Sequence, residues 1–241
     1  MYGCVIIIEI SKLDLQEGES IRMKNGKYLR IGFIAAIITV LGGELPLGWY
    51  IKPAINNLVQ AQIEGYASVS LLQLACGIFF GGLGIAFQSF GYEAIGTIIS
   101  ETTSCRKTAK LTHIGALFCG MFGPIVHILA IVLMYVCKSG NIDEVMRVAL
   151  YFVIPITLVF MPVYMAMMIS IFIAVIRGNT ELPMWSAFIN PAIIMGLVNG
   201  ITFLMGNSYI SNSVQMANMG FGSLITFLYW DTAYKRRNIS V

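Results

Sequence analysis

The sequence predicts an all-α, polytopic transmembrane helix bundle, and three observations lead to that fold class. Of the 241 residues, 57% are hydrophobic and 11% are charged, whereas soluble domains are about 45–50% apolar and about 25% charged. The charged residues are confined to short stretches. Between these stretches lie apolar segments of about 20 residues, the length that crosses a hydrocarbon layer of about 30 Å. We therefore expect the lipid bilayer to be the solvent of this chain.

Six spans account for the apolar segments, at residues 28–47, 68–98, 111–137, 148–176, 184–205 and 213–230. Trp49 and Tyr50, after the first span, are typical interfacial aromatics. The second span is long for one crossing, so we expect it to tilt or to emerge as a helix on the cytoplasmic side; seven spans also fit the pattern. Pro155 and Pro162 in the fourth span and Pro191 in the fifth each remove a helical hydrogen bond and favour a kink.

The positions of Lys and Arg predict the orientation of the spans. Three of the 15 lie in the expected outer loops, and these are Lys52, Lys138 and Arg147. The other twelve flank the spans on the opposite side. Because positive charge near spans stays in the cytoplasm, we expect both chain ends inside and a multi-pass protein of the cytoplasmic membrane. The net charge of +3 has the same origin, so no nucleic-acid partner is expected.

The sequence divides into an N-terminal tail (1–27), a single transmembrane domain (28–234) and a basic cytoplasmic tail (235–241). The stretch from Met23 to Lys27 resembles an ordinary start that leads into the first span. Glu17 to Glu19 can be encoded by a sequence that contains a bacterial ribosome-binding site. One hypothesis is therefore that residues 1–22 are a leader before a true start at Met23; the alternative is a genuine cytoplasmic tail.

Ionisable residues inside spans are costly and are functional candidates by default. Glu44 and His127 each lie 16 residues into their spans, or ~24 Å from the inner surface at 1.5 Å per residue, so they share one layer. Asn199, Asn218 and Gln73 fall near the same level. Together these residues form a candidate outer polar layer. For Glu44 the alternative is that its side chain simply reaches the headgroups.

A candidate inner polar layer lies near the cytoplasmic face. It contains Gln88, Tyr92 and Glu93 on the second span, His113 on the third and Asn190 beside Pro191 on the fifth. Pro191 frees a backbone carbonyl in the preceding turn, which is one way to build a polar site in a membrane helix. Two such layers fit alternating access, and they fit equally well polar groups that reach toward the two interfaces.

No cofactor or metal site is predicted. His113 and His127 are ~21 Å apart along one helix, too far to share an ion. The chain has neither an HExxH motif nor a G-x-S-x-G motif, which disfavours an intramembrane metalloprotease and a serine hydrolase. The five cysteines have no CxxC spacing. An enzymatic role is thus the less favoured class.

Two glycine pairs at four-residue spacing, Gly77/Gly81 and Gly196/Gly200, predict close helix packing. Packing within the chain is the first interpretation. A homodimer formed through the glycine faces is the second.

Three short stretches are similar to an uncharacterised family of bacterial multi-pass membrane proteins, described as a domain of unknown function. The first stretch is GELPLG at 43–48; the second runs from HIG at 113–115 through His127; the third runs from LPMW at 182–185 through Asn190. Members more often carry Asp where Glu44 stands. The resemblance implies no established activity, but it favours Glu44, His127, Trp185 and Asn190 as site residues.

Three functions remain open on these grounds. The first is binding or transport of a small or lipid-like molecule in a pocket between helices, with Glu44 and His127 as its ionisable pair. The second is a membrane-embedded, lipid-modifying enzyme with Glu93 and His113 as an acid–base pair. The third is a non-catalytic sensor, immunity or assembly protein.

Overall fold

The computed structural model describes residues 23–100, 105–180 and 182–239, with side chains described as far as residue 236, and every regular element in these ranges is helical. The leader hypothesis concerns residues 1–22, which lie outside the described residues. Within the described ranges, four helices are long and apolar enough to cross a membrane: Met23–Leu47, Leu71–Ser100, Arg106–Ser139 and Ile142–Ile176.

Three of the four long helices contain a wider, π-helical turn. The first helix includes η1 (Thr39–Glu44) and ends in α2 (Leu45–Leu47). The second consists of α4 (Leu71–Cys76), η2 (Gly77–Gly81) and α5 (Gly82–Ser100). The third is α6 (Arg106–Val136), which ends in the 3₁₀ turn η4 (Cys137–Ser139). The fourth consists of α7 (Ile142–Val148), η5 (Ala149–Val153) and α8 (Ile154–Ile176). A short helix, α3 (Leu58–Ala67), lies in the predicted first outer loop.

The last two predicted spans differ from the expected continuous helices. The fifth begins with a 3₁₀ segment, η6 (Met184–Phe188), and its α-helix, α9 (Pro191–Met205), has only 15 residues. That length spans ~22 Å, short of a hydrocarbon core of about 30 Å. The sixth is divided at Ala217 into α10 (Tyr209–Met216) and α11 (Asn218–Ile239). Among the described residues four helices are thus long and apolar enough to span, and the number of six crossings stays a prediction.

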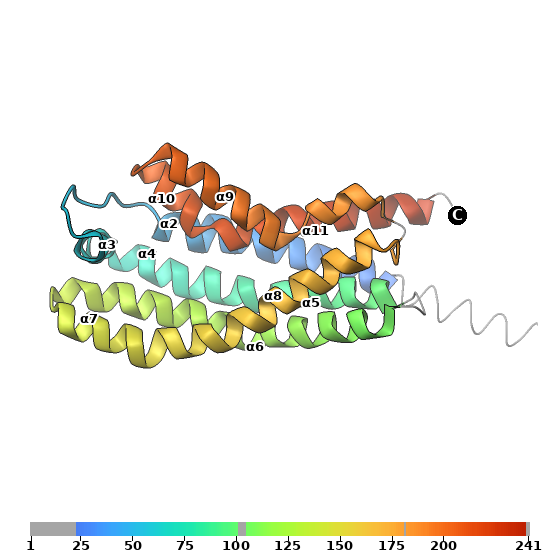
Figure 1. Ribbon diagram of the computed structural model, residues 1–241, viewed down its shortest axis with the longest axis horizontal. Helices are drawn as coiled ribbons and strands as arrows, with labels where there is room; N and C mark the ends of the chain where they lie inside the picture. Colours follow the sequence, from blue (N-terminus) through green and yellow to red (C-terminus); the bar gives the residue numbers. More distant parts are fainter. Residues whose placement is uncertain (1–22, 101–104, 181, 240–241) are drawn as a thin grey trace, which may run out of the picture.

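The helices lie side by side in a long bundle with neighbours antiparallel (Figure 1). The start of the first helix, the end of α5, the start of α6 and the end of α11 lie together at one end, which we call the terminal end. Helices α3, α7 and α10 lie at the opposite end. Contacts agree with this arrangement: a Cβ at Gly32 would meet Gly91, whereas one at Gly43 would meet Gly81. All six predicted segments therefore alternate in direction.

Glycines bring the first two helices into close contact. A Cβ at Gly43 would lie 2.7 Å from the Gly81 Cα atom, and one at Gly32 would lie 2.7 Å from the Gly91 Cα atom. A Cβ at Gly77 would lie 2.6 Å from the Leu47 side chain. Distances this short are not possible for real Cβ atoms, so only glycine permits the observed approach. Small residues have this role where lipid removes the hydrophobic drive for helix association.

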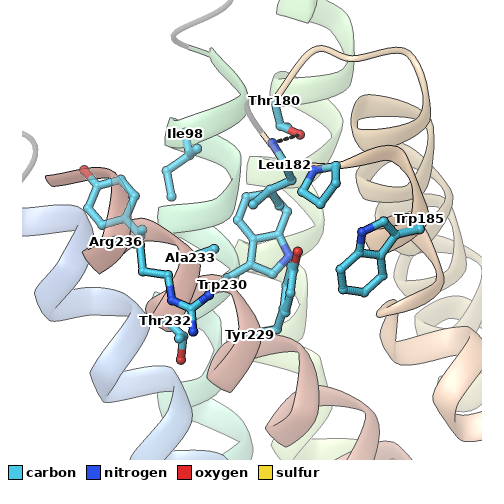
Figure 2. Close-up of a pocket in the computed structure, with 11 residues that line it drawn as sticks. Ile98, Thr180, Leu182, Trp185, Tyr229, Trp230, Thr232, Ala233 and Arg236 are labelled. Carbon is cyan, nitrogen blue, oxygen red and sulfur yellow. Dashed lines mark hydrogen bonds between the residues drawn. The ribbon is translucent and has the colours of Figure 1, made fainter. Parts of the chain in front are cut away.

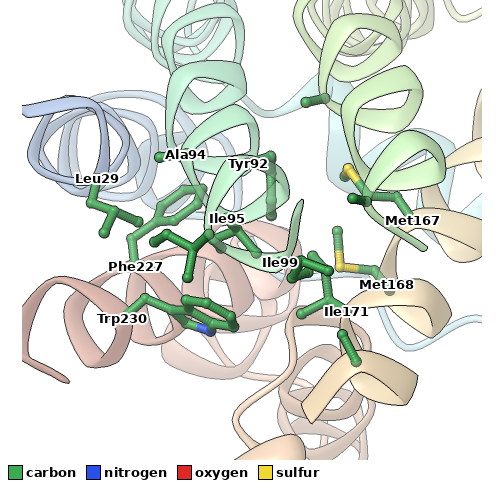
Figure 3. Packing of buried hydrophobic residues seen from close by; sticks show 14 of the residues in the cluster. Leu29, Tyr92, Ala94, Ile95, Ile99, Met167, Met168, Ile171, Phe227 and Trp230 are labelled. Atoms are coloured by element: carbon green, nitrogen blue, oxygen red, sulfur yellow. The ribbon is translucent and has the colours of Figure 1, made fainter. Parts of the chain in front are cut away.

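The main hydrophobic core lies in the half of the bundle nearer the terminal end. It combines side chains from the first helix, α5, α8 and α11, as Figure 3 shows for Leu29, Ile95, Met168 and Phe227. Phe227 packs against Tyr92 with ring centroids 4.7 Å apart. This core holds α11 against the long helices, so the first residues of α11 face the interior of the bundle.

Candidate functional site

A cavity of about 180 Å³ lies between the helices, which we call the central cavity. The first helix, α5, α6, α8, α10 and α11 all contribute to its wall. Its polar side chains come from residues far apart in the sequence, namely Glu44, Gln88, His127, Tyr164, Asn218 and Ser223. Convergence of polar groups in one apolar cavity is the usual form of a small-molecule site.

Glu44 is the acidic group of the central cavity. Only 6% of its surface is exposed, and it lies at the end of the π-helical turn η1. Its carboxylate lies against the backbone of Gly220 in α11. Among the residues that the structure describes, its Oε2 atom has no hydrogen-bond partner of normal geometry. A buried carboxylate without a partner is costly, and π-helical turns occur frequently at functional sites.

His127 lies on the other side of the same cavity. Its Nε2 atom is 3.1 Å from the carbonyl oxygen of Gly77 in η2. Since a carbonyl only accepts hydrogen bonds, this contact requires a proton on Nε2, which leaves Nδ1 of the neutral ring as an acceptor. A Cβ at Gly81 would overlap the imidazole. Gly81 of η2 therefore makes the room that the His127 ring occupies.

Asn218 links the central cavity to the fifth predicted span. Its Nδ2 atom donates to Oδ1 of Asn199 at 2.8 Å. Asn218 is the first residue of α11, directly after the break at Ala217. The break thus brings this amide to the cavity wall, and Asn199 supports it from α9.

Gln88 requires a correction to the predicted layers. Helix depth assigned it to the inner layer, but it lines the same cavity as Glu44 and its Nε2 atom donates to Oγ1 of Thr39 at 2.9 Å. Thr39 in turn donates to the carbonyl of Ala35. The predicted second span is long enough for position 88 to lie near mid-depth. Tyr92, one turn further, is hydrogen-bonded through its hydroxyl to Ser223 Oγ at 2.7 Å, so it too adjoins this cavity.

The remaining outer candidate, Gln73, lies elsewhere. It forms a capping box with Ser70 at the start of α4, and its Nε2 atom donates to the carbonyl of Pro46 at 2.8 Å. Its amide therefore joins the second helix to the end of the first. Gln73 does not line the central cavity.

Glu93 and His113 meet near the terminal end, apart from the central cavity. The Oε2 atom of Glu93 is 2.9 Å from Nδ1 of His113, and the side chains are 45% and 32% exposed. The two atoms lie within contact distance without the alignment of a hydrogen bond. Gly96 makes room for the ring, since a Cβ there would lie 2.9 Å from Nδ1.

The other predicted residues have separate positions. Asn190 caps α9 by accepting from the Ala192 amide, and it donates to the Met168 carbonyl at 2.9 Å. A Cβ at Gly196 or Gly200 would meet no described atom within 4 Å, so no described part of the chain packs on that face. Trp185 lines a second pocket at the terminal end.

Sequence reasoning missed two aromatic residues and one acidic residue. Phe160 and Tyr164 form part of the cavity wall and stack with ring centroids 5.6 Å apart; both follow a helical period within an apolar span, so nothing distinguished them from packing residues. Asp231 is buried near the terminal end, where it contacts Lys235 and lies 3.6 Å from Nε of Arg30. The sequence offered one indication of this pair, because Asp231 and Lys235 are four residues apart and opposite charges at that spacing meet on a helix.

Metal binding is not indicated by the described residues, in which no group of three or more His, Cys, Asp or Glu side chains is placed to hold an ion. The central cavity combines one carboxylate, neutral amides and hydroxyls, one imidazole and aromatic walls. This chemistry suits a small molecule that donates hydrogen bonds or carries a positive charge.

Comparison with known proteins places the chain in a family without identifying an activity. No curated protein and no solved structure matches it at a significant level. A family of unknown function, DUF6796, matches residues 19–236. This range includes all four long apolar helices and every residue of the central cavity. The chain therefore belongs to the family of unknown function DUF6796.

Proposed function

We propose that this protein is a multi-pass protein of the cytoplasmic membrane that binds a small molecule with a cationic or hydrogen-bond-donating group in the central cavity, and that it moves this molecule across the bilayer. The observation that carries the proposal is the Oε2 atom of Glu44, buried in the cavity wall without a hydrogen-bond partner of normal geometry among the described residues.

The distribution of charge supports the orientation. Nine described Lys and Arg residues lie in the segments at the terminal end, namely Lys24, Lys27, Arg30, Arg106, Lys107, Lys110, Arg177, Lys235 and Arg236, whereas Lys52, Lys138 and Arg147 lie in the segments at the opposite end. By the positive-inside rule the terminal end faces the cytoplasm. The alternating direction of all six segments supports six crossings, with the short α9 completed by the chain around η6.

Size favours a small solute over a whole lipid. The central cavity, at about 180 Å³, is smaller than the roughly 300–1,000 Å³ of sites for drug-sized ligands. A ligand of few heavy atoms fits it, and so does one polar end of a longer molecule.

The acidic and hydrogen-bond-accepting groups of the cavity favour a ligand that donates hydrogen bonds. Glu44, Gln88 and Asn218 each carry an oxygen that accepts hydrogen bonds, and a neutral His127 offers Nδ1. The rings of Phe160 and Tyr164 add faces that attract cations. An amine or ammonium group would satisfy Glu44, which otherwise bears the cost of an unpaired polar atom in an apolar site.

Matched pairs of small amines and alcohols of the same shape provide the test. Each compound is added to the purified protein in detergent, and the thermal shift is measured for the wild type and for Glu44→Gln. We expect some amines to stabilise the wild type, their alcohols to have less effect, and the difference to disappear in Glu44→Gln. Equal shifts for both members of every pair, or shifts that persist in Glu44→Gln, would contradict the proposal.

Transport is tested separately with the same compounds. An amine that stabilises the wild type should enter proteoliposomes faster than its alcohol, and Glu44→Gln should remove the difference. Binding without uptake would leave the protein as a membrane-embedded receptor for the amine.

A second candidate function follows from the contact between Glu93 and His113. A carboxylate 2.9 Å from an imidazole is the arrangement of a general acid–base pair, and both side chains are accessible near the proposed cytoplasmic interface. This favours a lipid-modifying enzyme as the alternative. Extracted membrane lipids incubated with the protein would then change in composition, and Glu93→Gln would abolish the change while Glu44→Gln would not.

A further inference from the structure

A second pocket, which we call the terminal pocket, opens at the terminal end of the bundle. Its volume is about 530 Å³, within the range of roughly 300–1,000 Å³ typical of ligand sites. One wall is the irregular segment between α8 and α9, which contributes Thr180, Leu182, Pro183 and Trp185. The facing wall is the last part of α11, and Ile98 of α5 also contributes.

The side chains of the terminal pocket form an apolar part and a polar part. Figure 2 shows Trp185, Tyr229 and Trp230 next to one another, with Arg236 and Thr232 toward the other side. Trp185 and Tyr229 meet edge to face with centroids 5.7 Å apart, and Trp185 is 60% exposed. Trp and Tyr side chains of this kind favour the boundary between hydrocarbon and headgroups.

Arg236 supplies the positive charge of the terminal pocket. Its guanidinium has five N–H donors in a planar fork that matches the oxygens of a phosphate. Thr180 and Thr232 also line the pocket, with their hydroxyls engaged in the chain: Thr232 donates to the Leu228 carbonyl and Thr180 accepts from the Leu182 amide. Among the described lining residues Arg236 is the one charged side chain, so the charge of the lining favours an anion.

We propose that the terminal pocket binds the phosphate headgroup of an anionic phospholipid from the cytoplasmic leaflet. Arg236 contacts the phosphate, and the rings of Trp185 and Tyr229 contact the glycerol and the first methylenes of the acyl chains. Basic pockets at the cytoplasmic ends of membrane helices recognise anionic headgroups in this way. The exposed apolar side chains of Met184 and Phe188, each 62% exposed, continue from this pocket into the region that the acyl chains would occupy.

The tryptophans provide a local reporter. The chain has three; Trp185 and Trp230 line the terminal pocket, whereas Trp49 stacks on Tyr209 at the opposite end. In a Trp49→Phe background, all tryptophan fluorescence therefore comes from the pocket. The protein is placed in phosphatidylcholine nanodiscs that contain a minor fraction of either brominated phosphatidylglycerol or brominated phosphatidylcholine, and quenching is measured.

We expect phosphatidylglycerol to quench more than phosphatidylcholine. Arg236→Gln should lower the preference about fivefold, the effect of one cation near an anionic surface, and Arg236→Lys should retain most of it. Arg177→Gln is the matched control, because Arg177 is an exposed basic residue at the same end that does not line the pocket; the preference should persist in this variant.

Three results would overturn the proposal. The first is equal quenching by the two brominated lipids, and the second is the same loss of preference in Arg177→Gln as in Arg236→Gln. The third concerns the source of the phosphate: if soluble glycerol phosphate relieves the quenching by phosphatidylglycerol, the site takes a soluble phosphate ester. None of these measurements involves the central cavity, so the outcome is independent of the amine test.

Discussion

The carboxylate of Glu44 lies directly against Gly220, so that a Cβ at position 220 would overlap its Oε2 atom. Helix α11 therefore packs directly against the acidic side chain of the first helix. This contact makes the shape of the central cavity dependent on a residue without a side chain.

Gly220→Ala should consequently displace Glu44. The added methyl would also lie 2.7 Å from the Val40 side chain, and we expect a loss of about 1–3 kcal/mol in stability, as is typical of overpacking. Unfolding in mixed micelles measures the effect. Gly196→Ala is the control, because a Cβ at position 196 would have no described atom within 4 Å. An equal effect of both variants would contradict the close approach of α11.

Glu44→Gln should make the unliganded protein more stable. A neutral amide of the same shape still buries a polar group but no charge, so it removes a desolvation cost of order 1–3 kcal/mol, which corresponds to a rise of about 2–4 °C per kcal/mol in a chain of this size. Thermal unfolding in detergent checks this. A marked fall would mean that Glu44 has a partner that stabilises the empty protein.

Gly81→Ala and Gly200→Ala should affect stability differently, because the two glycine pairs have different surroundings. A methyl at 81 would overlap the His127 ring, so we expect a loss of about 1–3 kcal/mol. A methyl at 200 meets nothing described, so Gly200→Ala should be neutral or up to about 1 kcal/mol more stable through helix propensity. Comparable losses in both variants would indicate that a second copy of the chain covers the Gly196/Gly200 face.

The pair Asn199 and Asn218 should be energetically coupled. Each single Ala variant leaves the other amide without its 2.8 Å partner, so the two losses should not add. A double-mutant cycle should give a coupling of about 0.6 kcal/mol, the average for hydrogen bonds between membrane helices. If the two losses in stability were strictly additive, the hydrogen bond to Asn199 would not position Asn218, and the cavity alone would do so.

The free energy of unfolding should fall more when the two cations beside Asp231 are removed than when Asp231 itself is neutralised. The side chain of Asp231 is 8% exposed, whereas Arg30 and Lys235 are 59% and 47% exposed. Removing both cations leaves a buried charge unpaired and should cost about 3–5 kcal/mol. Asp231→Asn leaves two cations that water can solvate, so its cost should be nearer ~1 kcal/mol. Unfolding of Asp231→Asn and of the Arg30→Gln, Lys235→Gln double variant would test this order.

Residue counting predicted a shared depth for two residues of the cavity, because a helix converts sequence distance into depth. Glu44 and His127 were expected at one level from a rise of about 1.5 Å per residue, and both line the central cavity. Helix depth could not predict that each side chain points into the bundle. For His127 that direction depends on Gly77 and Gly81 of another helix.

The structure departs from the predicted segments where the backbone leaves regular α-helix. Residues 184–190 and Ala217 interrupt the last two predicted spans, and their apolar composition hid the breaks. The hydrophobicity of a segment indicates whether it lies in lipid or in water. It says little about whether the segment forms one continuous helix. Those breaks bring Asn218 to the central cavity and Trp185 to the terminal pocket, so the least predictable segments contribute to both sites.

Native mass spectrometry of the gently extracted protein tests the central claim most directly. Wild-type protein equilibrated with an amine that stabilises it should retain one amine per chain, and Glu44→Gln should retain none, whereas Glu93→Gln should behave as the wild type. Retention of the amine by Glu44→Gln to the same extent as by the wild type would contradict the assignment of Glu44 and of the central cavity.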